Sequence, residues 1–192
     1  MNYPKTIAVF VATILPLGLI VSPALAHTGG HEAGMMAGLA HPLLGPDHLL
    51  AMLAVGIWAA MRPAKMAWHG PVVFLLMVGV GALLGMSGVA YSLVEPGIVA
   101  SVILLGVMVA IGRQLPASVG LAAIAVFALM HGQAHGLVAA GTGEVFILGV
   151  LAMTAVLHLV GYLVGKRLHQ FRYGAWLAGS FIAAGGLALI NT

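Results

Sequence analysis

The sequence predicts an all-α membrane protein in which a cleavable signal peptide precedes six transmembrane helices. Of the 192 residues, 62% are apolar and only 6% are charged, whereas about a quarter of the residues in a soluble domain are charged. The apolar runs are long and continuous, without the alternation that marks the strands of a membrane barrel. Because lipid offers no hydrogen bonds to the backbone, such runs must form helices.

The first residues, 1–26, are typical of a secretory signal peptide. Lys5 supplies the positive charge at the start, residues 7–21 form the apolar stretch, and residues 24–26 (Ala-Leu-Ala) form a cleavage site. The mature chain would then begin at His27, outside the cytoplasm. An uncleaved first helix is the alternative interpretation.

Six apolar segments follow a polar tail of residues 27–34 and make residues 35–192 one transmembrane domain. About 20 residues span a hydrocarbon core of ~30 Å, and only the third segment is clearly shorter than that. The predicted spans are residues 35–61, 68–91, 97–112, 117–140, 145–165 and 173–190.

The charges outside the signal peptide alternate between the predicted loops. The basic residues lie only in the first, third and fifth loops, and the other two loops hold Glu95 and Glu144. The positive-inside rule therefore predicts that both mature termini lie on the periplasmic side of an inner membrane. These basic residues are Arg62, Lys65, Arg113, Lys166, Arg167 and Arg172. Their scatter indicates membrane topology and a lipid environment, and it gives no sign of a nucleic-acid partner.

The first predicted span contains the motif HPLLGPDHLLAM at residues 41–52. Asp47 is the only carboxylate inside any predicted span, and an ionisable group at that depth indicates a functional site. The two prolines and the glycine between them predict that the helix is kinked or unwound, which frees carbonyl groups to line a polar cavity. If the helix continues, His41 and His48 are seven residues apart and share a face. A proline kink with hydrogen-bonded histidines and no ligand is the alternative.

A second motif, HGQAHG at residues 131–136, lies in the fourth predicted span. His131 and His135 are four residues apart, so they share a helical face and can reach one cation. Gly132 and Gly136 would let a neighbouring backbone approach closely.

The fifth predicted span adds His158, with Thr154 one turn earlier as a candidate hydrogen-bond partner. A single histidine in a span is explained equally well as a metal ligand or as a contact between helices.

The predicted depths of these residues suggest an outer approach that leads to a central metal site. Asp47, His48, His131 and His158 fall near mid-membrane, whereas His41 and His135 fall nearer the outer face. Imidazole and carboxylate groups suit nickel, cobalt or zinc, and the absence of cysteine excludes thiolate ligands. We expect the cation to be a transported substrate, with no permanently bound cofactor.

Four histidines are predicted to lie near the membrane surfaces. A mature N-terminus with His27 and His31 would place two imidazoles beside a free amine, which could capture metal outside the membrane or act only as a polar spacer. His69 and His169 lie next to basic loops and are better explained as interfacial residues than as ligands.

These motifs resemble the HupE/UreJ family of small membrane proteins. The resemblance rests on the signal peptide followed by His27, the motif of residues 41–52 with the AVGIWA that follows Leu53, the motif of residues 131–136, and His158. It covers essentially the whole chain. Membership implies six helices in the mature protein and uptake of nickel, in some members cobalt, for a hydrogenase or urease. Leu137 and Val138 stand where the family often has an acidic residue, which leaves the metal preference open.

The leading functional hypothesis is an inner-membrane permease rather than an enzyme. No nucleotide-binding motif is present, so the membrane potential or proton exchange would drive transport. Polar, broken spans at positions one and four suggest an inverted repeat of three plus three helices. The alternatives are an intramembrane zinc hydrolase and a metal-binding accessory or sensor protein. The sequence leaves a homo-oligomer open.

Overall fold

The structure, a computed structural model, describes residues 34–89, 92–139 and 143–191. The chain divides into two compact units, residues 1–30 and 31–192, and all the described residues belong to the second. The predicted signal peptide of residues 1–26 therefore lies outside the described residues, as do His27 and His31 of the tail.

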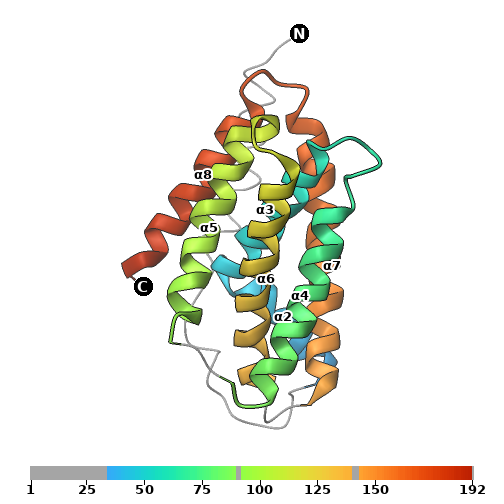
Figure 1. The fold of residues 1–192 in the computed structure, drawn as a ribbon, viewed down its shortest axis with the longest axis vertical. Coiled ribbons are helices and arrows are strands. Elements are labelled where there is room, and N and C mark those ends of the chain that lie inside the picture. Colours follow the sequence, from blue (N-terminus) through green and yellow to red (C-terminus); the bar gives the residue numbers. More distant parts are fainter. Residues whose placement is uncertain (1–33, 90–91, 140–142, 192) are drawn as a thin grey trace. The chain divides into compact units, whose positions relative to one another are not determined.

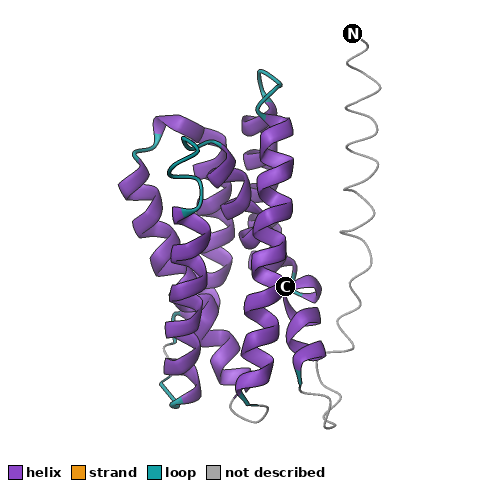
Figure 2. Cartoon of the chain, turned by 90° about the vertical axis from the view of Figure 1, so that its right-hand side faces the viewer, coloured by secondary structure: helices purple, strands orange, loops and turns teal. Residues whose placement is uncertain are grey.

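Every regular element among the described residues is a helix, so the predicted all-α class is confirmed. Long helices run side by side in alternating directions (Figures 1 and 2). Their outward faces carry large apolar side chains such as Leu76, Leu83 and Leu163, which are 65%, 68% and 57% exposed. Extended apolar faces of this kind favour contact with lipid over contact with water. The elements are α2 (Met35–Leu44), α3 (Pro46–Ala60), α4 (His69–Met86), α5 (Val94–Ile111), η3 (Gly112–Gln114), α6 (Ala117–Ala139), α7 (Glu144–Leu168), α8 (Gly174–Ala188) and η4 (Leu189–Asn191).

The first predicted span is broken at Gly45. Helices α2 and α3 meet there at 84°, and Gly45 has an extended backbone with φ −88° and ψ 110°. A residue that precedes proline is pushed out of the helical region, and Pro46 is well suited to begin the next helix because it needs no hydrogen-bond acceptor there. The predicted kink or unwinding is thus a full break, which places Asp47 in the first turn of α3.

Helix length supports four or five of the six predicted spans. Helices α4, α6 and α7, and α5 together with η3, are long and apolar enough to cross a membrane. The bent pair α2 and α3 passes the same test as a broken span or a re-entrant loop. Helix α8 has 15 residues, which rise only about 22 Å at 1.5 Å per residue, short of a ~30 Å core.

The prediction that the third span is short, residues 97–112, is wrong. Helix α5 begins at Val94 and continues through η3 to Gln114, 21 residues in all. Glu95 and Pro96 lie in its first turn, where a carboxylate is favoured and a proline is tolerated. A glutamate followed by a proline is also typical of a loop, which is why residue 97 was the predicted start of the span.

Helix α6 lies against α4 with almost no side chain between them. A Cβ atom added at Gly132 would collide with the Val78 carbonyl oxygen, and one added at Gly136 would collide with that of Ala82. The predicted close approach of a neighbouring backbone at both glycines is confirmed. It holds the histidine-bearing part of α6 at a fixed position beside α4.

The main helix pairs correspond to one another when the first three spans are exchanged for the last three. Helix α4 packs on α6, the pair α2 and α3 packs on α7, and α5 packs on α8. The exchange replaces the pair α2 and α3 by α6, α4 by α7, and α5 by α8. The contact of α4 with α6 then becomes the contact of α7 with the pair α2 and α3, and the contact of α5 with α8 is unchanged. The predicted break in the fourth span is wrong, however, because α6 is one continuous helix of 23 residues.

Positive and negative side chains lie at opposite ends of the helices. The Arg62 guanidinium donates to the carbonyl oxygens of Gly112 at 2.7 Å and Leu115 at 3.1 Å, which joins the loops after α3 and α5. Glu95 and Glu144 lie in the first turns of α5 and α7, at the other ends of these helices. We call these the basic end and the acidic end.

Candidate metal site

Three imidazoles from three helices gather beside the break in the first span. His41 on α2, His48 on α3 and His135 on α6 each offer one nitrogen atom, and these atoms lie within 4.8 Å of one another. No other group of three histidine or acidic side chains among the described residues is arranged in this way. Nitrogen atoms on a tetrahedral metal with bonds of 2.0–2.1 Å are about 3.4 Å apart, so small ring movements would close the group on a cation.

The break itself brings the first two of these rings together. The ring centroids of His41 and His48 are 5.6 Å apart, and that of His135 lies 5.0 Å from His41 and 4.7 Å from His48. The prediction that His41 and His48 share a face assumed a continuous helix. They meet instead across an 84° angle, which allows His135 of α6 to reach both.

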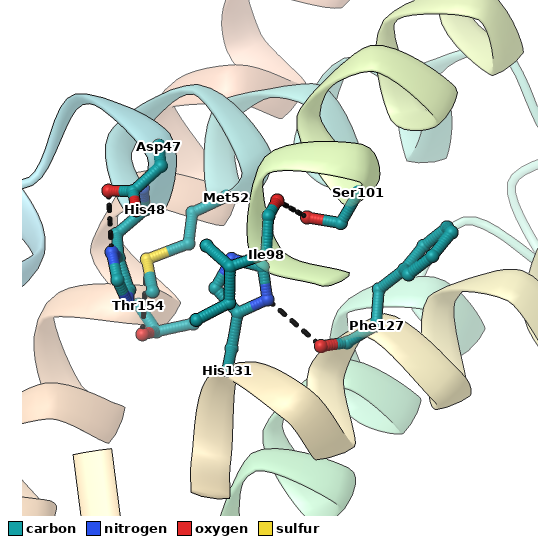
Figure 3. A network of polar contacts seen from close by, with 8 residues as sticks. All are labelled: Asp47, His48, Met52, Ile98, Ser101, Phe127, His131 and Thr154. Atoms are coloured by element: carbon teal, nitrogen blue, oxygen red, sulfur yellow. Dashed lines mark hydrogen bonds and ion pairs between the residues drawn. The ribbon is translucent and has the colours of Figure 1, made fainter. Parts of the chain in front are cut away.

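Asp47 contacts His48 and is not part of the three-residue group. Its Oδ1 atom accepts the backbone N–H of His48 at 2.8 Å and lies 2.7 Å from the Nδ1 atom of the same residue, as Figure 3 shows. A carboxylate accepts hydrogen bonds, so it favours the tautomer with the proton on Nδ1 and the lone pair on Nε2. The Nε2 atom of His48 is buried and has no hydrogen-bond partner. A carboxylate that orients a ligand histidine is a common feature of metal sites.

His131 is held in the same tautomer by the backbone of its own helix. Its Nδ1 atom donates to the Phe127 carbonyl oxygen at 2.9 Å (Figure 3). The Nε2 atom is buried without a hydrogen-bond partner, and the ring centroid lies 5.0 Å from that of His48. His131 therefore extends the cluster as a fourth available imidazole.

His158 lies apart from the other four histidines, behind Phe74. The Phe74 ring centroid is 5.0 Å from that of His158 and 5.9 Å from that of His131. Both ring nitrogens of His158 are buried without a hydrogen-bond partner. The predicted bond from Thr154 is wrong, because its hydroxyl contacts the Met52 sulfur at 3.3 Å instead.

Sequence reasoning missed Phe74, since one phenylalanine in an apolar span carries no signal of a functional position. The ring contacts with His131 and His158 appear only once α4, α6 and α7 are assembled.

The five histidines form a column that starts near the acidic end. At 1.5 Å per residue, His135 and His131 lie about 6 Å and 12 Å from the last residue of α6, and His158 lies about 21 Å from the first residue of α7. We call these residues the histidine column, in the order His41, His135, His48, His131 and, beyond Phe74, His158. His48 contacts both the outer and the deeper histidines, so the residues predicted to form an outer and a central site lie in one continuous row.

Comparison with known proteins identifies the family of the chain. The family model described as "HupE / UreJ protein" matches residues 15–189. The chain belongs to the HupE/UreJ family. Protein HupE of Rhizobium leguminosarum bv. viciae is 37% identical over 200 residues, which cover 99% of this chain and 99% of that protein. No solved structure matches the chain.

Among the described residues of this HupE/UreJ protein, two further histidines lie outside the column. His69 is exposed, and its Nδ1 atom contacts the Met66 carbonyl oxygen at 3.1 Å. His169 is exposed in the loop before α8. Neither belongs to the three-imidazole group, as expected for interfacial residues.

Proposed function

We propose that this protein is a secondary permease of the inner membrane that moves a divalent transition metal into the cytoplasm. The observation that carries the proposal is the group formed by His41, His48 and His135, whose nitrogen atoms lie within 4.8 Å of one another. His41 and His48 come from the two sides of the broken span, and His135 comes from α6. Nickel is the first candidate for the transported ion, cobalt the second and zinc the third. The metal would supply a hydrogenase or a urease.

The chemistry of the donors fits such a cation. Neutral imidazole nitrogens bind borderline divalent metals well, and His48, His131 and His135 each have a buried nitrogen without a hydrogen-bond partner. Asp47 adds one negative charge beside His48, which offsets part of the cost of placing a dication away from water. The metal would bind transiently and move along the column.

The arrangement of the helices supports alternating access. Related packing of the two halves is the architecture in which one half rocks against the other around a central site. The break at Gly45 gives the first span a place to bend, and Phe74 separates His158 from the outer four histidines. We therefore assign His41 and His135 to the entry of the path and His158 to its inner part.

Charge separation supports the orientation. The positive-inside rule places the basic end in the cytoplasm, so the acidic end and the entry of the histidine column face the periplasm. Both mature termini then lie in the periplasm after cleavage of residues 1–26, where His27 and His31 would capture metal outside the membrane. The membrane potential would contribute roughly 4–5 kcal/mol for a dication at 100 mV.

A metal-dependent hydrolase fits the site less well. Such an enzyme needs a general base that is free to accept a proton from the attacking water. Among the described residues Asp47 is the one carboxylate that contacts a histidine of the column, and it already accepts two hydrogen bonds from His48. The protein is therefore proposed as a transporter rather than an enzyme.

The test is metal uptake by the purified full chain reconstituted in liposomes that contain a fluorescent metal chelator. We expect nickel and cobalt to enter faster than in empty liposomes and magnesium to remain outside. The His48→Ala and His135→Ala variants should show no uptake above that background. If the wild-type protein binds nickel in detergent but no transition metal enters the liposomes, an accessory or sensor role replaces the permease. Hydrolysis of a peptide or ester that requires zinc and His48 would favour the enzyme.

A further inference from the structure

A polar pocket lies at the basic end, away from the histidine column. It has a volume of about 490 Å³ and lies between η3 and the loop before α8. We call it the basic-end pocket. Its polar lining comes from Arg113, Gln114, His169, Gln170 and Arg172.

The basic-end pocket is strongly positive and has no counter-ion among the described residues. The Nε atom of Arg113 donates to the Met61 carbonyl oxygen at 2.9 Å, which leaves its two Nη groups free to bind an anion. Burial and the neighbouring Arg113 charge lower the pKa of Arg62, as expected where two guanidinium groups share a surface. The described carboxylates lie elsewhere: Asp47 is on His48, and the glutamates are at the acidic end.

An apolar groove adjoins this pocket on α8. It has a volume of about 430 Å³ and is lined by Tyr173, Trp176 and Leu177. Trp176 also lines the basic-end pocket and is therefore the wall that the two share. All three side chains are more than half exposed. Tyrosine and tryptophan are enriched at the level of lipid headgroups, which places this junction at the membrane surface.

We propose that the basic-end pocket binds the phosphate headgroup of an anionic phospholipid whose acyl chain lies in the groove of α8. Guanidinium groups bind phosphate oxygens with paired hydrogen bonds, and basic pockets at the cytoplasmic side of membrane helices bind acidic headgroups. A free phosphate would use the pocket but leave the groove empty. The continuous polar and apolar surfaces therefore fit a lipid. The site does not depend on the metal path.

The test measures retention of phosphatidylglycerol by native mass spectrometry of the full chain, extracted from bilayers that mix phosphatidylglycerol with phosphatidylcholine. The Arg113→Gln/Arg172→Gln variant should bind phosphatidylglycerol about 10- to 30-fold more weakly than the wild type. The matched control is Lys166→Gln/Arg167→Gln, which removes the same charge from the exposed end of α7, outside the pocket. The control should change binding less than about threefold. Equal losses in both variants would show diffuse charge attraction and overturn the proposal.

Two further measurements are needed. The first uses a single variant that preserves the fold, and the second distinguishes a bound lipid from a bound free anion. Arg172→Gln alone removes a guanidinium whose described contact is the Tyr173 ring at 5.0 Å, so it leaves the Arg113 bond intact and should still weaken retention. Trp176→Ala should weaken retention, whereas Trp68→Ala, an exposed tryptophan that stacks on Tyr162, should not. If Trp176→Ala has no effect and millimolar inorganic phosphate displaces the lipid completely, the pocket binds a free anion and the lipid proposal is wrong.

Discussion

The Nδ1 atom of His48 lies 2.7 Å from Oδ1 of Asp47, the residue that precedes it in the sequence. The same oxygen also accepts the backbone N–H of His48. This pair of contacts gives the carboxylate a definite role beside the three imidazoles. It fixes the tautomer and the direction of the His48 ring, so that the Nε2 lone pair is available to a cation.

We expect Asp47→Asn to bring metal uptake close to background while the protein remains folded. The amide oxygen can still accept both hydrogen bonds from His48, but the negative charge that stabilises a bound dication is lost. Loss of an outer partner of a ligand histidine typically weakens metal binding by about 10- to 100-fold. Uptake of radioactive nickel or cobalt into liposomes measures the effect.

The control for this variant is Glu144→Gln, which removes a carboxylate from the acidic end without touching His48. It should retain most of the uptake. Wild-type uptake by Asp47→Asn would remove the carboxylate from the mechanism.

We expect replacement of a column histidine by alanine to lower the metal affinity far more than replacement of an interfacial histidine. His48→Ala and His131→Ala each remove an imidazole with a buried, unpartnered nitrogen. Loss of a group that only orients a ligand histidine lowers metal affinity by ~10- to 100-fold, so loss of the histidine itself should lower it further. His69→Ala and His169→Ala change exposed residues and should leave affinity within about twofold. Titration calorimetry with nickel in detergent compares the four variants. Similar losses in all four would contradict the assignment of the column.

The chemistry of the site could be predicted from the sequence better than its geometry. The two motifs identified His41, His48, His131 and His135, because charged and polar groups inside an apolar chain are rare enough to stand out. The grouping of His135 with His41 and His48 could not be predicted, since it depends on the 84° angle at Gly45 and on the packing of α6. Local sequence indicates where a helix breaks but not the direction in which it continues.

The first and last residues of the spans were predicted less accurately than the existence of the apolar segments. Glu95 and Pro96 read as loop residues but belong to α5, because the first turn of a helix accepts both. The prediction of a sixth span rested on residues 173–190, yet α8 has only 15 residues before η4. Where a helix ends depends on the helices packed against it, and the hydropathy of a segment contains no information about that packing.

We expect Gly132→Leu to destabilise the protein much more than Gly79→Leu. A side chain at Gly132 would meet the backbone of Val78, whereas no atom lies within 4 Å of the position that a Cβ would occupy at Gly79. Overpacking against a backbone that cannot move aside costs about 1–3 kcal/mol or more. Thermal unfolding in detergent should show a clear fall in Tm for the first variant and little change for the second. Equal values would mean that α4 and α6 are not in close contact.

We expect uptake to fall as the pH on both sides of the membrane is lowered together. Free histidine takes up its second proton near pH 6.5, and an imidazole that carries both protons cannot coordinate a metal. Protons therefore compete with metal at the ligand imidazoles, and uptake should decline as the pH falls through and below the range in which histidine titrates.

The pH measurement needs an ionophore that removes the proton gradient, because transport coupled to inward proton flow would increase in acid on the outer side alone. With the gradient removed, the change of uptake with pH measures only the competition between protons and metal for the imidazoles. Binding that did not vary with pH under this condition would exclude the imidazoles as the main ligands.

The break at Gly45 separates two of the clustered histidines. His41 and His48 lie on separate rigid helices joined by a single residue, so the distance between their nitrogens changes with the angle between α2 and α3. A cation held by both fixes that angle, and a change of that angle releases the cation. Metal occupancy and the angle between α2 and α3 are then governed by the same equilibrium. The distance between two spectroscopic labels, one on each helix, would therefore report metal binding without any metal-sensitive probe.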